Sequence, residues 1–159
     1  LTYGFTGLPT FAAGDGVLTV ATTGTGNAGI DLGDSVDEFM EVFFGGTSLG
    51  RFECGVANDA GSLIPGATDD SANPVGNQCL FTLPLTVPES TLLAAISDGE
   101  VDVTLQMGAQ VAAFPDSPSN DEIAVTLDYE PAVIPLPASV PLLLAGLGAL
   151  GLAGRRRAR

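Results

Sequence analysis

Residues 1–130 alternate between apolar and polar positions in short runs that turn residues separate. Val101, Val103 and Leu105, for example, alternate with polar neighbours, as in a strand with one buried and one solvated face. The pattern predicts strands at Leu1–Phe5, Gly16–Thr23, Glu38–Phe44, Leu80–Val87, Thr91–Ile96, Glu100–Met107 and Glu122–Tyr129. Because each strand buries one face, we expect an all-β fold, an antiparallel β-sandwich. Leu1–Phe5 is expected at a sheet edge, and Pro84 at an edge or a bulge.

The pattern changes at Pro131, beyond which no acidic residue occurs. The 17 residues of Ala138–Gly154 are apolar except for Ser139, and as a helix they measure about 25 Å. That length is at the short end of what spans a bilayer core of about 30 Å. We therefore expect a β-sandwich domain at 1–130, a Pro-rich linker at 131–138 and a single C-terminal transmembrane helix at 139–159. A buried core helix is the alternative, which the terminal arginines disfavour.

Four arginines follow the apolar run: Arg155, Arg156, Arg157 and Arg159. A basic cluster directly after a membrane span is typical of a stop-transfer anchor that stays in the cytoplasm. The body then lies outside the cytoplasmic membrane, facing the periplasm. Since such a body must be exported, and the sequence opens on Leu1, we expect a leader that has already been removed.

The net charge of the chain excludes one class of function. The formal net charge is −14, and Arg51 is the only basic side chain before the terminal cluster, against 19 acidic ones. Such a surface repels phosphate backbones, which excludes nucleic-acid binding. The chain has no His, the usual general base and a common metal ligand, and no Trp for stacking on sugars. We therefore expect no enzymatic activity.

Two cysteines, Cys54 and Cys79, enclose a segment rich in Gly, Asn, Asp and Pro. In an oxidising compartment they would form one disulfide, worth roughly 3 kcal/mol for a loop of this size. Two free buried thiols in a reducing compartment are the alternative. The expected export of the body favours the disulfide.

Acidic residues gather in the segments between strands, and some of them suit a cation. Oxygen ligands from such segments at the rim of a sandwich are what Ca²⁺ requires. If Ca²⁺ binds, we expect its ligands among Asp31, Asp34, Asp37, Glu38 and Asp121. The alternative is a solvated acidic surface that keeps the protein soluble, and the absence of an EF-hand pattern favours it. No other cofactor is expected.

Two segments of the chain resemble known protein families. Ile134 followed by Pro135, Leu136, Pro137 and Ala138, the apolar run and the arginines resembles the VPLPA type of PEP-CTERM protein-sorting signal. The resemblance implies an exported protein of a Gram-negative bacterium, whose tail an exosortase-family membrane protease recognises through residues 135–138. The body run GDGVLTVATTGTGNAGIDLGDSVDEFMEVFFGGTSLG resembles exported bacterial jelly-roll domains, which implies a jelly-roll-like sandwich.

Together these features favour a non-enzymatic surface or extracellular-matrix protein, anchored in the inner membrane or released to the cell surface after processing. Its expected partners are the lipid bilayer, the exosortase-family protease and an exopolysaccharide. The alternative is an accessory subunit of an inner-membrane complex, whose retained helix packs on other membrane helices through small residues such as Ala145, Ala149 and Ala153.

Overall fold

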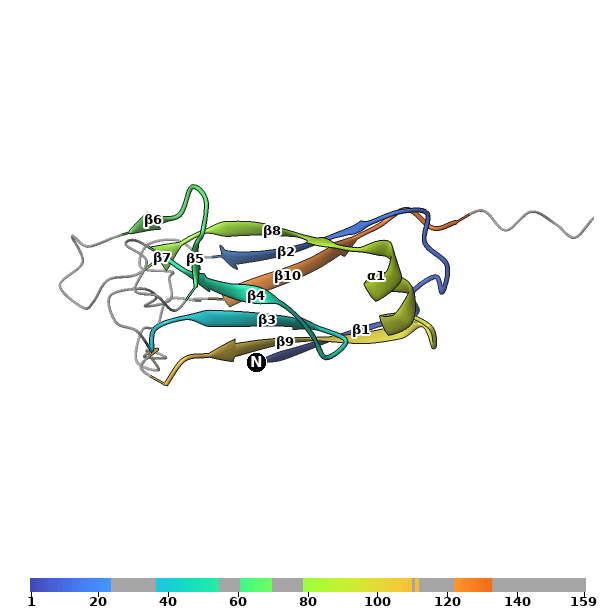
Figure 1. Ribbon diagram of the computed structural model, residues 1–159, viewed down its shortest axis with the longest axis horizontal. Helices are drawn as coiled ribbons and strands as arrows, with labels where there is room; N and C mark the ends of the chain where they lie inside the picture. The colour runs from blue at the N-terminus through green and yellow to red at the C-terminus, as the bar shows by residue number, and fades with distance from the viewer. Residues whose placement is uncertain (24–36, 55–60, 70–78, 110, 112–121, 133–159) are drawn as a thin grey trace, which may run out of the picture.

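Ten strands and one short helix make up the part of the chain that the computed structural model describes, namely residues 1–23, 37–54, 61–69, 79–109, 111 and 122–132 (Figure 1). The strands are β1 (Thr2–Thr6), β2 (Gly16–Thr23), β3 (Met40–Phe44), β4 (Thr47–Glu53), β5 (Ser62–Leu63), β6 (Thr68–Asp69), β7 (Cys79–Leu80), β8 (Thr82–Val87), β9 (Glu100–Met107) and β10 (Glu122–Asp128). The helix α1 (Glu89–Ala95) connects β8 to β9. The described part of the chain is thus mostly β, as its alternation predicts.

The strands form two main sheets and a small third one. The five-stranded sheet has the order β1-β9-β3-β4-β5, and the three-stranded sheet has the order β10-β2-β8. All pairings are antiparallel except that of β4 with the two-residue β5. The antiparallel expectation therefore holds with one parallel exception, while the jelly-roll topology stays a prediction. A two-stranded sheet of β6 and β7 completes the described pairings.

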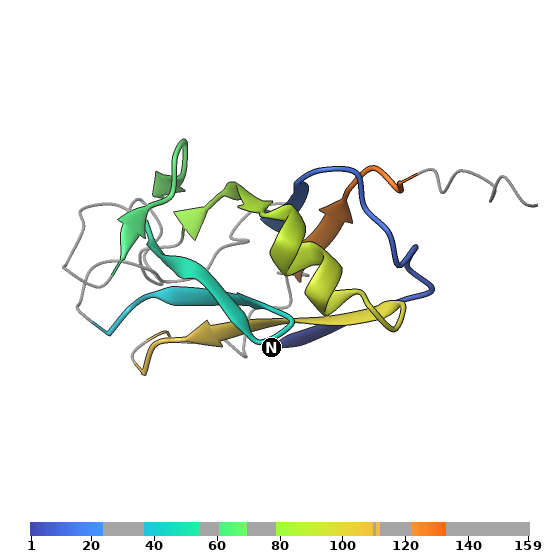
Figure 2. The same cartoon turned by 45° about the vertical axis from the view of Figure 1, so that its right-hand side comes forward.

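The core lies between the two main sheets, which face each other in Figure 2. Alternate residues of each strand point inward, so that Leu18 and Val20 of one sheet and Val42 and Phe44 of the other are fully buried. Phe11, which a simple count of aromatic residues would assign to the core, is 51% exposed. Burial thus follows strand position rather than residue type alone.

Helix α1 replaces the strand expected at Thr91–Ile96, and this expectation was wrong. Leu92 and Ile96 are both fully buried and stand four residues apart, so they lie on the same face of a helix. Pro88 occupies the N-cap position with extended backbone angles, φ −55° and ψ 142°. A short apolar run with Leu and Ala suits a helix as well as a strand, and here the helix buries both large side chains.

Two predictions about sheet edges are confirmed. Strand β1 is the first strand of the five-stranded sheet, and its only described partner is β9. Pro84 lies in β8, which is an edge strand of the three-stranded sheet and pairs there with β2. Proline lacks a backbone N–H, so an edge strand is where it is tolerated.

The sandwich has two distinct ends, on the right and left of Figure 1. We call the end on the right the tail end: it carries residues 7–15, the Gly45–Gly46 turn, α1 and residues 129–132. We call the other the loop end: β2 and β4 finish there, β3 and β10 begin there, and both cysteines lie there. Antiparallel pairing fixes this arrangement, because Thr23 faces Glu122 at one end and Val17 faces Asp128 at the other.

Candidate functional site

The point where the C-terminal segment leaves the sandwich is tied to the body by backbone hydrogen bonds. The Ala132 N–H donates to the Phe11 carbonyl at 3.1 Å, and the Ala13 N–H donates to the Glu130 carbonyl at 2.8 Å. Ala12 and Pro131 form the bridge between these bonds. The last described residues are therefore held like a short strand against residues 11–13.

A tyrosine side chain adds to this attachment. The Tyr129 hydroxyl donates to the Pro9 carbonyl at 2.8 Å. Burial raises the pKa of this hydroxyl above its ordinary value of 10.0, because the charged phenolate is poorly solvated there. Tyr129 is thus a neutral donor at neutral pH, and it links the segment after β10 to the segment after β1.

The residues expected to carry sorting lie beyond this attachment, outside the described residues. They are Pro135, Leu136, Pro137 and Ala138 of the motif and Arg155, Arg156, Arg157 and Arg159 of the basic cluster. The transmembrane helix expected at 139–159 lies there as well. Within the described ranges, no helix is long and apolar enough to cross a membrane.

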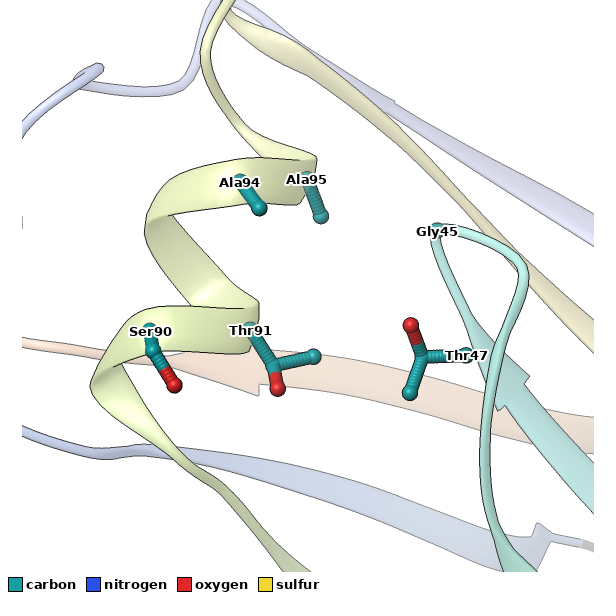
Figure 3. Close-up of a pocket in the computed structure, with 6 residues that line it drawn as sticks. All are labelled: Gly45, Thr47, Ser90, Thr91, Ala94 and Ala95. Atoms are coloured by element: carbon teal, nitrogen blue, oxygen red, sulfur yellow. The ribbon is translucent and has the colours of Figure 1, made fainter.

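Helix α1 and the β3–β4 turn enclose a groove at the tail end, of about 280 Å³ (Figure 3). Its lining residues are small or carry hydroxyls: Gly45, Thr47, Ser90, Thr91, Ala94 and Ala95. Gly45 has a φ of 54°, and a Cβ there would lie 2.7 Å from the Cβ of Ala95. Only glycine therefore allows the turn to approach the helix this closely.

A neighbouring hollow of about 500 Å³ shares Gly45, Ala94 and Ala95 with this groove and continues toward Asp98, Glu100 and Asp102. The groove offers hydroxyl oxygens, the hollow offers hydroxyl and carboxylate oxygens, and neither is lined by a basic side chain that would activate a serine. Their chemistry suits hydrogen bonding to a neutral or cationic group. Sequence reasoning missed both, because it assigned the helix that forms one wall to a strand.

The disulfide prediction is confirmed. Cys54 and Cys79 are bonded, with their Cα atoms 6.0 Å apart and a separation of 25 positions in the sequence. Both are buried, at 4% and 2% exposure. The bond lies at the loop end, where it joins the end of β4 to the start of β7. A disulfide is typical of a protein that folds outside the cytoplasm.

Two of the five expected Ca²⁺ ligands fall within the described chain. Asp37 is exposed and Glu38 is buried, immediately before β3, while Asp31, Asp34 and Asp121 lie outside the described residues. In the parts that are described, no group of three or more acidic, His or Cys side chains is placed to hold a metal ion. The calcium site therefore stays a prediction.

Arg51, the one base of the body, is already engaged on the outer face of the five-stranded sheet. Its Nε lies 3.2 Å from the Glu41 carboxylate, and its guanidinium lies 4.2 Å from the centre of the Phe39 ring. The Ser48 hydroxyl donates to the same carboxylate at 2.9 Å. This cluster neutralises the arginine locally, so it adds no positive surface that would attract an anionic partner.

Comparison with family models identifies the C-terminal segment. Residues 133–157 match the PEP-CTERM protein-sorting motif, which includes Pro135–Ala138 and Arg155–Arg157 and stops two residues before Arg159. The match starts at the residue after Ala132, where the described body ends. Searches among curated proteins and among solved structures gave no match. The motif implies an exported protein of a Gram-negative bacterium that exosortase, a membrane protein, sorts.

Proposed function

We propose that this chain is a non-enzymatic surface or extracellular-matrix protein. Its C-terminal segment holds it in the inner membrane, with the sandwich in the periplasm, until an exosortase-family protease processes it. The sorting motif at 133–157 carries the proposal. The disulfide between Cys54 and Cys79 supports it, since such bonds persist in oxidising compartments.

The arrangement of the tail end also favours this function. The match to the sorting motif begins one residue beyond a backbone attachment, so the motif follows the sandwich with no free linker between them. The Pro-rich stretch of residues 135–137 then separates the attachment from the apolar run. A protease in the membrane would meet the motif directly below a closed, rigid domain.

The composition of the chain and the lining of its described depressions fit a structural or binding role. The whole chain lacks His and Lys, and neither described depression places a serine beside a base. Hydroxyl-lined, acidic depressions suit contacts with neutral sugars of an exopolysaccharide, which we propose as the matrix partner. Negative charge on the body disfavours a strongly anionic polymer unless cations bridge the two.

The experiment is mass spectrometry of the protein from its native host, on cell-associated and released fractions. We expect the released form to lack a C-terminal segment, with the new end within residues 133–157. Replacing Pro135 and Pro137 together by Ala should prevent this loss and keep the chain intact in the membrane. Pro131→Ala, which changes a proline just outside the match, is the matched control and should be processed normally.

An intact C-terminus in every fraction, together with a detergent-stable complex, would overturn this proposal. That outcome would instead support the accessory-subunit alternative, in which the tail is a permanent membrane helix.

A further inference from the structure

The four edges of the two main sheets differ in how they are protected. An edge strand offers unpaired backbone groups to a strand of another chain, and proteins commonly block this with short strands or proline. Strand β5 is only two residues long, and β8 contains Pro84. The opposite edges, β1 with five residues and β10 with seven, contain no proline. Each described sheet therefore has one protected and one open edge.

Charge distinguishes the two open edges. Strand β10 begins with Glu122 and ends with Asp128, so antiparallel pairing of two copies about Val125 would set these acids opposite each other. Like charges directly opposite destabilise a strand pair. Strand β1, with the sequence TYGFT, carries no charged side chain. Of the two open edges, β1 is therefore the one where a second copy can pair without setting acids of the two edge strands opposite each other.

Three residues of β1 direct their backbone N–H and C=O groups away from β9. Leu1 exchanges both of its backbone hydrogen bonds with Leu105, at 3.0 and 2.8 Å. In an antiparallel pair such hydrogen-bonded positions recur every second residue, so Tyr3 and Phe5 face β9 with their N–H and C=O groups. The corresponding groups of Thr2, Gly4 and Thr6 are directed away from β9, toward the open side.

These features fit pairing with a second copy of the same chain. We propose that β1 is a self-association edge, to which a second copy of this chain adds its own β1 in antiparallel orientation about Gly4. Thr2 then faces Thr6 of the second copy, and Gly4 faces Gly4 of the second copy. Tyr3 and Phe5, half-buried at the rim of the core, form cross-strand aromatic pairs. The two five-stranded sheets become one continuous sheet.

The nearest acids weaken this approach without lying on the paired strands themselves. Glu100 and Asp102 lie on β9, opposite Thr6 and Gly4. The two β9 backbones are three strand spacings apart, about 14 Å, but the Asp102 Oδ1 lies 3.4 Å from the Cβ position of Gly4. The two Asp102 carboxylates are therefore closer than the backbones, and salt screens their repulsion only in part. The interface is small compared with about 1,200 Å² for a stable complex, so we expect weak association that confinement at a membrane or surface strengthens.

The dyad at Gly4 gives a direct test by crosslinking. In this pairing the two Gly4 Cα atoms lie about 5.5 Å apart, within the range that a disulfide spans. A Cβ at Gly4 would lie 3.4 Å from the Asp102 Oδ1, an ordinary contact, so Gly4→Cys is tolerated. The native cysteines are bonded to each other, which leaves the new thiol as the one available for reaction.

We expect the Gly4→Cys variant of this chain, purified in detergent, to form an adduct of twice the 16.0 kDa chain under mild oxidation. Thr2→Cys is the matched control, because the two Thr2 positions are about 14 Å apart along the paired strands, too far for a disulfide. The Gly4→Cys adduct should form about tenfold faster than the control adduct, because pairing raises the effective concentration of that thiol alone. Equal rates, or an adduct in native membranes with a different protein, would overturn the proposal.

Charge variants provide a second readout by sedimentation. Thr2→Lys with Thr6→Lys places ammonium groups opposite each other across the dyad and should weaken self-association. Thr2→Glu with Thr6→Lys places opposite charges there and should restore or strengthen it. Both pairs change the same two exposed positions, so a loss of folding would affect both alike. Equal association of the two variants would contradict pairing through β1.

Discussion

The tail end and the loop end of the sandwich are closed by different means. At the tail end, backbone bonds tie residues 11–13 to residues 130–132, and α1 inserts Leu92 and Ile96 into the core. The loop end relies on a covalent bond between Cys54 and Cys79. The end that adjoins the sorting motif is therefore held by packing and hydrogen bonds, which do not depend on redox conditions. The opposite end depends on export to an oxidising compartment for its full stability.

At the tail end, we expect the largest loss of stability when the core contact of α1 is removed. Leu92 is fully buried, so Leu92→Ala should lower the free energy of unfolding by about 3–4 kcal/mol through lost contacts and a cavity. Denaturant unfolding of the purified chain measures this change. Ser90→Ala, on the exposed side of the same helix, should stay within about 0.5 kcal/mol. Similar effects of the two variants would show that α1 does not close the tail end.

The disulfide is the matching test at the loop end. Replacing Cys54 and Cys79 together by Ser should cost about 3 kcal/mol, because the unfolded chain regains the freedom of the closed loop. Limited proteolysis should then cut first between residues 54 and 79. The attachment of residues 11–13 to 130–132 should remain protected, and early cleavage there would contradict the separation of the two ends.

A smaller effect is expected from Asp15, which lies before β2 and bonds to the first turn of α1. The Asp15 carboxylate accepts a hydrogen bond from the Glu89 N–H at 2.9 Å, and so satisfies a donor in the first turn of α1. Asp15→Ala should reduce the free energy of unfolding by about 1 kcal/mol. Asp15→Asn keeps an acceptor oxygen and should recover most of this loss. If Asn were as damaging as Ala, the carboxylate would act by its charge rather than by this bond.

The smallest effect concerns Tyr129 and depends on pH. Tyr129→Phe removes the hydrogen bond to the Pro9 carbonyl and should cost about 0.5–1 kcal/mol near neutral pH. Burial raises the pKa of Tyr129 in the folded state above 10.0, its ordinary value, so folding favours the protonated form. This contribution is complete below pH 10 and is lost as the pH rises through the raised pKa. Unfolding curves at about pH 8 and pH 11 should therefore differ more between the two proteins at the lower pH.

Strands with regular alternation could be predicted from the sequence almost to the residue. Gly16–Thr23 and Glu100–Met107 begin and end as expected, because alternating residues on a half-buried strand leave a clear pattern. Thr91–Ile96 could not be assigned correctly, since six residues with three apolar types fit either period. The decisive facts, burial of Leu92 and Ile96 on one face, depend on tertiary packing.

The candidate sites were predictable to different degrees. The sorting motif is a local pattern of residues, so sequence alone identified Pro135–Ala138 and the arginines, and the family match covers all of these except Arg159. The Cys54–Cys79 bond followed from the count of two cysteines and the expected export. The groove at α1 was missed, because its walls come from residues 45–47 and 90–95, which only the fold brings together.

The pairing of β10 with β2 determines how the body carries a mechanical load. Seven residue pairs, from Glu122 and Thr23 to Asp128 and Val17, join the strand that leads to the tail to the central strand of its sheet. A pull on the tail along β10 stretches these hydrogen bonds in shear, so that many must break together rather than one at a time. A load on the tail is thereby passed into the centre of the three-stranded sheet, so that the tail and the sandwich behave as one mechanical unit.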